Sequence, residues 1–324
     1  MNHDHTRLSR RTFLAGSAFL ASGFARTQQA PIPIIDTHIH FFDTTRPQGV
    51  PYPGPTKGPR NLPIADPETY RKVATPFGVV GAIEVEASNW IEDNLWVLEV
   101  SQKDPMIVGT VGNLEPDKPE FREYLGRYHK NPLFRGIRYG SIWGRNLDAQ
   151  VENPAFVAGI KDLAAADLTL DIVLTGPSTI ETMVRLTDKV PTLRVVLDHL
   201  PNLTPPTQPA ELHAHERNLR ELARRNVYVK VSEVVQWVDG KVPTDLAFYK
   251  PRLDMIWDIF GEDRLLFGSD WPQTPGNWVS MATVISIVHD YFFEKGRPAA
   301  EKYFWKNSLA AYKWVKRDAS QPSM

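Results

Sequence analysis

The chain has 324 residues, 42% of them hydrophobic, with no cysteine and a formal net charge of −1 at pH 7. This length and composition suffice for one large core or two small ones. The charges are balanced and well mixed, so they give no reason to expect nucleic acid or an anionic membrane as a partner, and a small molecule is the expected partner. The lack of cysteine excludes thiol catalysis, disulfides and Cys-ligated zinc, and leaves histidines and carboxylates as the strong metal ligands.

The first thirty residues have the composition of a leader peptide. Arg10 and Arg11 precede a weakly apolar run that ends in small residues, where cleavage is expected. The string SRRTFL at residues 9–14 resembles a twin-arginine signal, which implies export of a folded precursor and a periplasmic or secreted protein. A cytosolic amphipathic tail is the alternative. We predict a signal over residues 1–30 and a folded domain over residues 31–324, with no other run near the ~20 apolar residues that span a bilayer.

From residue 31 onward, apolar segments of strand length alternate with segments of helical periodicity. Strands separated by helices imply parallel pairing, and eight such units favour a single-domain (β/α)8 (TIM) barrel with an extra C-terminal helix. A doubly wound open sheet is the alternative, but no Gly-x-Gly-x-x-Gly turn follows the first strand. The predicted strands span residues 34–40, 79–87, 106–114, 134–139, 168–174, 193–199, 227–235 and 265–269. The predicted helices begin near residue 67 and then span residues 91–103, 119–129, 154–166, 178–189, 210–225, 244–260, 278–293 and 298–315.

The first predicted strand ends in two histidines, His38 and His40. Side chains alternate across a strand, so Asp36, His38 and His40 are expected on one face, where they could hold a metal. The chain has two other His-x-His pairs, and both fail on context. One lies in the polar N-terminus and the other in a predicted helix, where residues two apart diverge in direction.

Barrel enzymes carry their chemistry at the C-terminal ends of the strands. The sixth predicted strand ends in His199, and Asp270 follows the eighth. Taken singly, a strand-end histidine is more often a core residue, and Asp270 more often a turn or cap residue. Together with His38 and His40 they can converge on one divalent ion, and such a ligand set suits zinc.

Several of these segments are similar to motifs of the amidohydrolase superfamily. They are DTHIH at residues 36–40, DH at residues 198–199 and GSDWP at residues 268–272. More narrowly, they resemble the amidohydrolase-related branch of lactone hydrolases and decarboxylases. The resemblance extends to GIR at residues 136–138 and VKVS at residues 229–232, and so covers nearly the whole folded domain. The set of motifs is specific, whereas any one motif is not.

The resemblance implies a role for each candidate ligand. His38 and His40 would be the first-strand ligands, His199 the distal histidine, and Asp270 the group that takes the proton of the attacking water. The fifth predicted strand lacks the histidine that many members supply, and the fourth offers no carboxylated lysine. One divalent ion rather than two is therefore expected, although some lactonases of this branch work without a metal.

The chemistry expected from this site is hydrolysis of a lactone. Bound zinc lowers the pKa of its water towards ~7 and polarises a carbonyl. Asp270 would accept the proton and return it to the leaving oxygen, and His199 would support the oxyanion if it is not a ligand. The substrate is expected to be a sugar-acid or carboxylated lactone. A metal-dependent decarboxylase is the enzymatic alternative, and a non-catalytic exported ligand-binding barrel is the alternative of another class.

Four further residues are candidate substrate contacts. Arg138 and Lys230 lie on predicted inward faces and could bind a substrate carboxylate or hydroxyl groups. Alternatively, Arg138 pairs with a structural carboxylate such as Glu84 or Glu86. Glu86 is expected to reach the interior, and Trp271 either walls the pocket or packs in the core.

The connection over residues 41–66 is rich in proline and glycine and is expected to form an irregular lid. Aromatic side chains on the rim could pack against a sugar ring. The rim candidates are Tyr52, Arg60 and Asn61 in this connection, with Trp237 and Trp278 after the last two strands.

Overall fold

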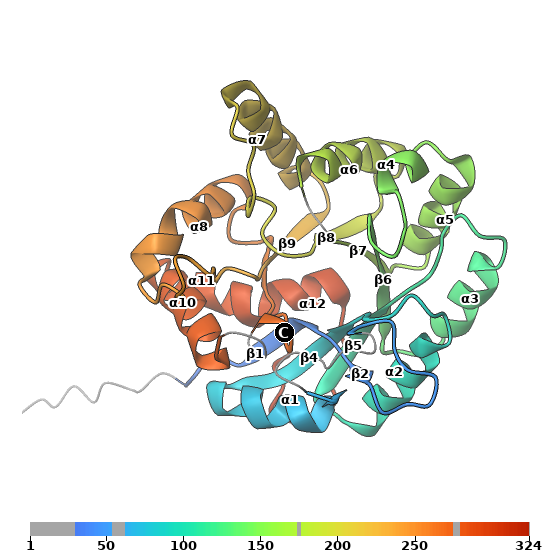
Figure 1. Ribbon diagram of the computed structural model, residues 1–324, viewed down its shortest axis with the longest axis horizontal. Coiled ribbons are helices and arrows are strands. Elements are labelled where there is room, and N and C mark those ends of the chain that lie inside the picture. Colours follow the sequence, from blue (N-terminus) through green and yellow to red (C-terminus); the bar gives the residue numbers. More distant parts are fainter. Residues whose placement is uncertain (1–29, 54–61, 174–175, 275–278, 324) are drawn as a thin grey trace, which may run out of the picture. The chain divides into compact units, whose positions relative to one another are not determined.

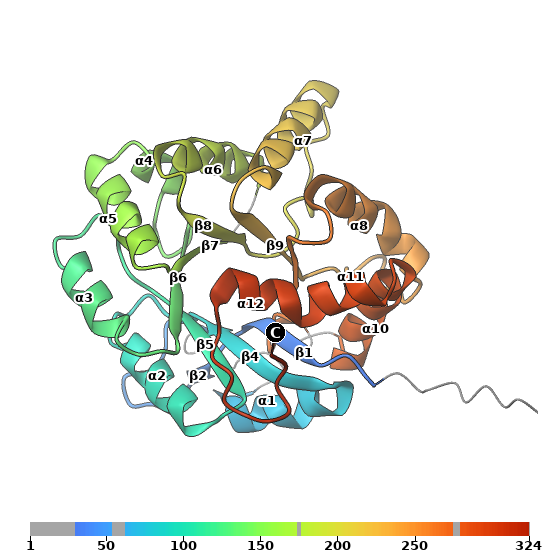
Figure 2. The same ribbon diagram turned by 180° about the vertical axis from the view of Figure 1, so that it is seen from behind.

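The computed structural model describes residues 30–53, 62–173, 176–274 and 279–323. Eight parallel strands pair in chain order, with helices around them (Figures 1 and 2). The last strand bonds back to the first, because the His40 amide donates to the Trp271 carbonyl at 2.8 Å and the Asp270 amide to the His38 carbonyl at 2.9 Å. The predicted (β/α)8 barrel is therefore confirmed.

Each predicted barrel strand has a counterpart in the structure. The barrel strands are β1 (Ile34–Ile39), β4 (Val79–Val85), β5 (Ile107–Gly112), β6 (Phe134–Gly140), β7 (Thr169–Val173), β8 (Arg194–Leu197), β9 (Val227–Val231) and β10 (Leu265–Phe267). The helices are α1 (Pro67–Ala74), α2 (Asp93–Lys103), α3 (Phe121–Tyr128), α4 (Leu147–Gln150), α5 (Pro154–Ala165), α6 (Pro177–Lys189), α7 (Pro209–Ala223), α8 (Leu246–Phe260), α10 (Met281–Glu294), α11 (Arg297–Glu301) and α12 (Asn307–Tyr312).

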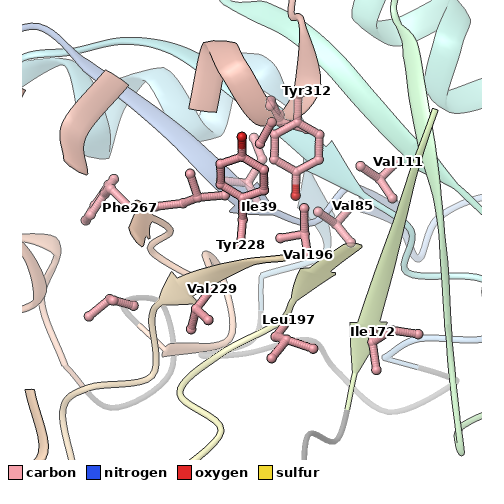
Figure 3. Close-up of a cluster of buried hydrophobic side chains, with 14 of the residues drawn as sticks. Ile39, Val85, Val111, Ile172, Val196, Leu197, Tyr228, Val229, Phe267 and Tyr312 are labelled. Atoms are coloured by element: carbon pink, nitrogen blue, oxygen red, sulfur yellow. The ribbon is translucent and has the colours of Figure 1, made fainter. Parts of the chain in front are cut away.

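Local sequence accounts for many of these boundaries. The side chains of Asp66, Asn153, Asp245 and Ser280 each accept a hydrogen bond from the first turn of the helix that follows. Gly261, directly after α8, has a φ of 68° that disfavours other residues. The strands are buried along most of their length, as expected for a parallel sheet covered by helices. Figure 3 shows their buried apolar side chains packed together, with Tyr312 of α12 among them.

Three segments differ from the sequence-based expectation. The predicted irregular connection contains a short antiparallel pair, β2 (Phe42–Asp43) with β3 (Ile64–Ala65), which is too short to give a periodic pattern. The four-residue helix α4 was not predicted, for the same reason. The last predicted helix ends at Tyr312, because Lys313 takes a left-handed backbone conformation with φ 52°.

The chain after α12 is held against the strand starts. The Val315 amide donates to the Val108 carbonyl at 2.9 Å. The Arg317 guanidinium donates to four carbonyls, those of Ser101, Gln102, Asp104 and Ile107. Figure 2 shows α12 lying across one end of the barrel. The C-terminal segment thus covers the amino-terminal ends of β4 and β5, away from the strand ends where the candidate ligands lie.

The described chain from Ile32 onward belongs to one compact unit. All but the last residue of the signal predicted over residues 1–30 lies outside the described residues, so the signal and its boundary remain predictions. Among the described residues, no helix combines the length and apolar character needed to cross a membrane.

Candidate metal-binding active site

Three neighbouring strands of the barrel end in residues with a left-handed backbone. His199 after β8 has φ 64°, Glu233 after β9 has φ 53°, and Asp270 after β10 has φ 60°. Positive φ is uncommon outside glycine and costs on the order of 1–3 kcal/mol when a residue is held there. Three such φ angles at the same end of adjacent strands indicate that the fold holds these side chains in set positions for function.

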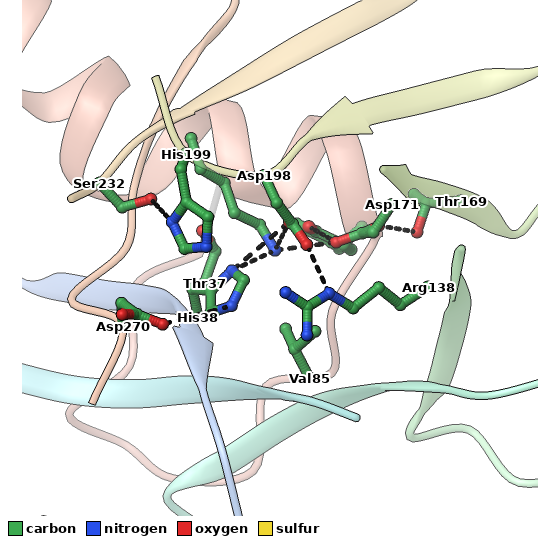
Figure 4. Close-up of polar contacts among 12 residues, drawn as sticks. Thr37, His38, Val85, Arg138, Thr169, Asp171, Asp198, His199, Ser232 and Asp270 are labelled. Carbon is green, nitrogen blue, oxygen red and sulfur yellow. Dashed lines mark hydrogen bonds and ion pairs between the residues drawn. The ribbon is translucent and has the colours of Figure 1, made fainter. Parts of the chain in front are cut away.

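Candidate ligand atoms converge at this end of the barrel. His38, His199 and Asp270 each offer one atom, and these atoms all lie within 4.8 Å of one another. The three residues come from β1 and from the ends of β8 and β10, and their side chains point toward one another in Figure 4. Nε2 of His38 lies 3.7 Å from Oδ1 of Asp270. All three side chains are buried, so an ion held there would be largely removed from solvent.

His40 completes the predicted ligand set. Its Nε2 lies 3.2 Å from Nε2 of His38 and 3.4 Å from Oδ1 of Asp270. Its Nδ1 lies 2.8 Å from the Val85 carbonyl, which can only accept, so Nδ1 carries the proton and Nε2 presents a lone pair to the cluster. A ring nitrogen held by a carbonyl in this way is typical of metal-binding histidines. The donor set therefore fits a divalent ion such as zinc.

His199 is oriented by the end of β9. Its Nδ1 lies 2.9 Å from the Ser232 hydroxyl, which leaves Nε2 for the cluster. Nε2 lies 3.8 Å from Oε1 of Glu233. The sequence reasoning did not single out Glu233. Its position directly after the VKVS segment of the seventh strand was the signal that could have found it.

The electrostatics favour the protonation states that a metal requires. Burial alone would raise the pKa of Asp270, but the adjacent rings of His40, His199 and His38 lower it to about 2. Burial, and then the positive charge of Lys230, lower the pKa of His38 well below its usual value. Asp270 therefore faces the site as a carboxylate, and His38 as a neutral imidazole.

Asp36 is used differently from the expectation. The pairing of β1 with β4 shifts register between Asp36 and Ile39, which interrupts simple alternation. One carboxylate oxygen of Asp36 accepts from the amides of His38 at 3.1 Å and Ser269 at 2.9 Å, and the other from the Tyr70 hydroxyl at 2.6 Å. Asp36 therefore links β1, the end of β10 and α1, and holds the strand that carries the histidines.

Lys230 lies beneath the cavity instead of on its wall. Its side chain is fully buried, and Nζ lies 2.8 Å from Oδ2 of Asp171 and 2.8 Å from Oδ1 of Asp198. The Tyr312 hydroxyl donates to Asp171 at 2.5 Å. We call Lys230, Asp171 and Asp198 the buried charge network. A substrate-binding role for Lys230 has no geometric support, because its charge is already neutralised by two aspartates. The sequence pattern predicts that Lys230 faces inward, but it does not show which strands carry the aspartates that pair with it.

Arg138 reaches the cavity from β6. Its Nε donates to Oδ2 of Asp198 at 2.9 Å, and its Nη1 donates to the backbone carbonyl of Glu86 at 3.3 Å. The alternative that Arg138 pairs with a structural carboxylate thus matches the structure, but the carboxylate belongs to Asp198 and not to Glu84 or Glu86. Asp171 and Asp198 were not assigned a role from the sequence, and the signal for both was an aspartate within an apolar strand.

A cavity of about 550 Å³ opens beside the ligand cluster. This volume lies in the range of small-molecule sites. Glu86 is buried in its wall, where burial raises the pKa to about 7 against the opposing charges of Arg138 and Arg145. The polar and aromatic lining residues include His40, Glu86, Arg138, Trp143, His199 and Asp270.

The remaining rim candidates take different positions. Tyr52 lines the cavity and donates a hydrogen bond to Gln273. Trp271 is 4% exposed and packs against Tyr70 with ring centroids 5.1 Å apart, so it is core packing and not a cavity wall. Trp237 is 61% exposed beside a shallower neighbouring pocket. The last three candidates lie outside the described residues: Arg60, Asn61 and Trp278.

Comparison with known proteins agrees with this geometry. The sequence model of a family described as Amidohydrolase matches residues 35–314. An L-fucono-1,5-lactonase of Burkholderia ambifaria is 26% identical over 239 residues, covering 74% of this chain and 80% of that protein. An L-fucono-1,5-lactonase of Burkholderia multivorans is 28% identical over 245 residues, covering 74% of this chain and 81% of that protein.

A solved structure is similar in fold. It is an amidohydrolase from Burkholderia multivorans with bound Zn, superposed with a TM-score of 0.74 at 24% identity, covering 87% of this chain and all of that one. The family match extends from β1 to beyond α12 and includes all four candidate ligands. This chain belongs to the amidohydrolase family and is a hydrolase.

Proposed function

We propose that the protein is a lactonase that opens uncharged sugar-acid lactones by attack of an activated water. The observation that carries the proposal is the convergence of His38, His199 and Asp270 on one point beside a cavity of substrate size. The two relatives aligned by sequence above are L-fucono-1,5-lactonases, and each alignment covers about three quarters of this chain. A sugar-acid lactone is therefore the substrate class with the most support.

The charges of the cavity favour an uncharged lactone over a carboxylated one. Among its described lining residues, Arg138 is the only arginine or lysine, and it is paired with Asp198. The lining also contains three further carboxyl groups, those of Glu86, Glu233 and Asp270. A substrate carboxylate would therefore find no unpaired cationic side chain among these described residues, and the carboxylates of Glu233 and Asp270 would repel it. Sugar hydroxyls both donate and accept hydrogen bonds, so they suit this wall.

Different residues of the chain would serve different steps of hydrolysis. A divalent ion held by the histidines and Asp270 would supply an activated water and polarise the lactone carbonyl. Asp270 accepts the proton of the attacking water through Oδ1, the oxygen that faces the histidines. Its other oxygen accepts from the Thr274 hydroxyl at 2.8 Å, which fixes the orientation of the carboxylate. Arg138 holds the wall on which the sugar hydroxyls would lie.

The decarboxylase alternative has less support from the same observations. A decarboxylase must accept a carboxylate as its reacting group, and the one cavity arginine is already paired with an aspartate. Retention of a ligand without turnover would instead favour a binding protein.

The test is a pH-indicator assay of the purified protein on a panel of lactones. L-fucono-1,5-lactone and other uncharged aldonolactones are compared with a glucarolactone, which carries a free carboxylate. We expect proton release with the uncharged lactones and at least about tenfold lower kcat/KM for the carboxylated one, the effect of about 1.4 kcal/mol of repulsion. Release of CO2 from an aromatic acid, with no lactone opened, would overturn the proposal.

We further propose that the protein is exported, on the strength of the SRRTFL string at residues 9–14. Cell fractionation of the full chain tests this. The wild type is expected in the periplasm or medium, and a variant with Arg10→Lys and Arg11→Lys is expected to stay inside the cell. Equal distribution of both would contradict export by this route.

A further inference from the structure

We propose that Glu86, at the end of β4, is the acid that protonates the leaving ring oxygen of the lactone. The inference rests on the proposed lactonase function and adds a second proton-transfer residue to it. Asp270 would then serve the attacking water only. The two proton transfers of the reaction would take place on different walls of the cavity, one formed by β1, β8 and β10 and the other by β4 and β6.

The chemistry of ring opening requires such a group. Attack forms a bond from the water oxygen to the carbonyl carbon, and the bond from this carbon to the ring oxygen then breaks. The electron pair stays on the ring oxygen, which would leave as a strongly basic alkoxide without a proton donor. Glu86 gives its proton to this oxygen, which becomes a hydroxyl group, and regains a proton from solvent, while Asp270 releases to solvent the proton that it took from the attacking water. The product acid ionises and releases the proton that the indicator detects.

The carboxyl group of Glu86 is held in place in the cavity wall. The Ser88 amide donates to Oε2 at 3.0 Å, and Nε1 of Trp143 donates to Oε1 at 3.3 Å. Glu86 is 3% exposed and lines the cavity. Trp143 itself lies in a left-handed conformation with φ 57°, which indicates that the indole is held in a set position. The side chain is therefore oriented before substrate arrives.

The end of β4 connects this wall to the ligand cluster. The Val85 carbonyl holds Nδ1 of His40 at 2.8 Å, and the next carbonyl, that of Glu86, accepts from Arg138 at 3.3 Å. The carbonyls of Val85 and Glu86 thus fix the positions of His40, a candidate metal ligand, and Arg138, the cationic side chain of the cavity wall. A lactone whose carbonyl faces the histidines would lie between them and the Glu86 wall.

The other polar residues on the described cavity wall are poorer acids for this step. Arg138 does not release a proton in proteins. The Tyr52 hydroxyl donates to Gln273, and burial together with the charge of Asp270 raises its pKa to about 12. Oε1 of Glu233 lies 3.8 Å from Nε2 of His199, so this carboxyl group stands beside the candidate ligands and not on the opposite wall. Glu86 remains as the carboxyl group that can give and regain a proton.

Its surroundings support this role. Burial raises the pKa of Glu86 to about 7, while Arg138 from β6 and Arg145 from the segment after β6 oppose the rise. Glu84, on the same strand, is also buried, and burial followed by repulsion from Glu86 raises its pKa well above the usual value. A group of this acidity is present in both protonation states near neutral pH, which suits an acid that must be recharged. Since the protonated form acts, activity should fall as pH rises through about 7.

The test compares Glu86→Gln with the matched variant Glu84→Gln. Glu84 lies two residues earlier on β4 and is absent from the described lining of the catalytic cavity; it lines a small neighbouring cavity, which Glu86 also borders. Each variant is assayed on L-fucono-1,5-lactone and on its 5-thio analogue, in which sulfur replaces the ring oxygen. A thiolate, with a pKa of about 8.5, leaves without a proton donor.

We expect Glu86→Gln to lower kcat on the oxygen lactone by about 100-fold or more. The same variant should keep the wild-type rate on the thiolactone and lose the fall in activity above about pH 7. Glu84→Gln should behave as the wild type on both substrates. Metal content and thermal midpoint of Glu86→Gln, measured alongside, should match those of the wild type.

Three results would overturn the proposal. Glu86→Gln could lose rate equally on both substrates, which would show a binding or structural role, or it could keep the wild-type rate on the oxygen lactone. The third result is that the fall in activity above about pH 7 disappears in Glu233→Gln and not in Glu86→Gln. In each of these cases the wild type still opens lactones, so the proposed function stands. A wild type that opens neither substrate would overturn the proposed function and this inference together.

Discussion

The barrel interior holds two polar layers whose side chains are of similar type but differ in access to the cavity. In the upper layer, His40, His199 and Asp270 line the cavity and keep ligand atoms directed at one point. In the lower layer, Lys230 and Asp171 are fully buried and bonded to each other. An inward-facing charge in a barrel is therefore a candidate for chemistry only when its partners leave an atom free.

His38 connects the two layers. Its Nε2 faces His40 and Asp270, whereas its Nδ1 lies 3.2 Å from Nζ of Lys230 and 3.4 Å from Oδ1 of Asp198. A hydrogen bond from Nδ1 to Asp198 would leave Nε2 unprotonated, as metal binding requires. The lower layer therefore serves the upper one by orienting this ring, besides its contribution to the fold.

The largest expected effect is on catalysis in the upper layer. Asp270→Asn removes the base and changes one ligand atom, so kcat on L-fucono-1,5-lactone should fall by about 1000-fold or more. The thermal midpoint should change little, because an amide can still accept the hydrogen bond from Thr274. Proton release measured with the pH indicator gives the rate. Activity within a few fold of the wild type would remove Asp270 from the mechanism.

In the lower layer the expected effect is on stability. Lys230→Met leaves the buried Asp171 without its cation and Asp198 with Arg138 alone, so the free energy of unfolding in urea should fall by about 3–5 kcal/mol. Lys250→Met is the matched control, because Lys250 pairs with Asp254 on the partly exposed surface of α8, where solvent screens the pair, and its loss should change the stability little. Similar stabilities for the two variants would show that the buried charge network does not stabilise the fold.

A smaller effect on the free energy of unfolding is expected at the edge of the lower layer. Tyr312→Phe removes the hydroxyl that donates to Asp171, a loss of about 1–3 kcal/mol in unfolding free energy. The rate on the lactone should stay close to the wild-type value, because Tyr312 does not line the cavity among the described residues. A large loss of rate with unchanged stability would contradict the separation of the two layers.

Much of the upper layer could be predicted from the sequence. Each candidate ligand is the polar residue that ends an apolar strand, and the order of the strands follows from their alternation with helices. Because parallel strands of a barrel end on one face, His38, His199 and Asp270 had to lie near one another. The structure brings them within 4.8 Å, together with His40.

The lower layer could not be predicted, because its partners are set by three-dimensional neighbours. Lys230 and Asp171 are 59 residues apart, and Asp171 and Tyr312 are 141 apart. No local pattern relates them. The direction of the Asp36 side chain could not be predicted either, because the sequence pattern does not reveal the register shift between β1 and β4.

The most direct test of the account follows proton release from L-fucono-1,5-lactone before and after removal of bound metal, with elemental analysis of each sample. The account predicts one divalent ion per chain in the active protein, loss of lactone opening when the ion is removed, and recovery on addition of one equivalent. Lactone opening at the full rate by metal-free protein, or none by the metal-loaded protein, would contradict it.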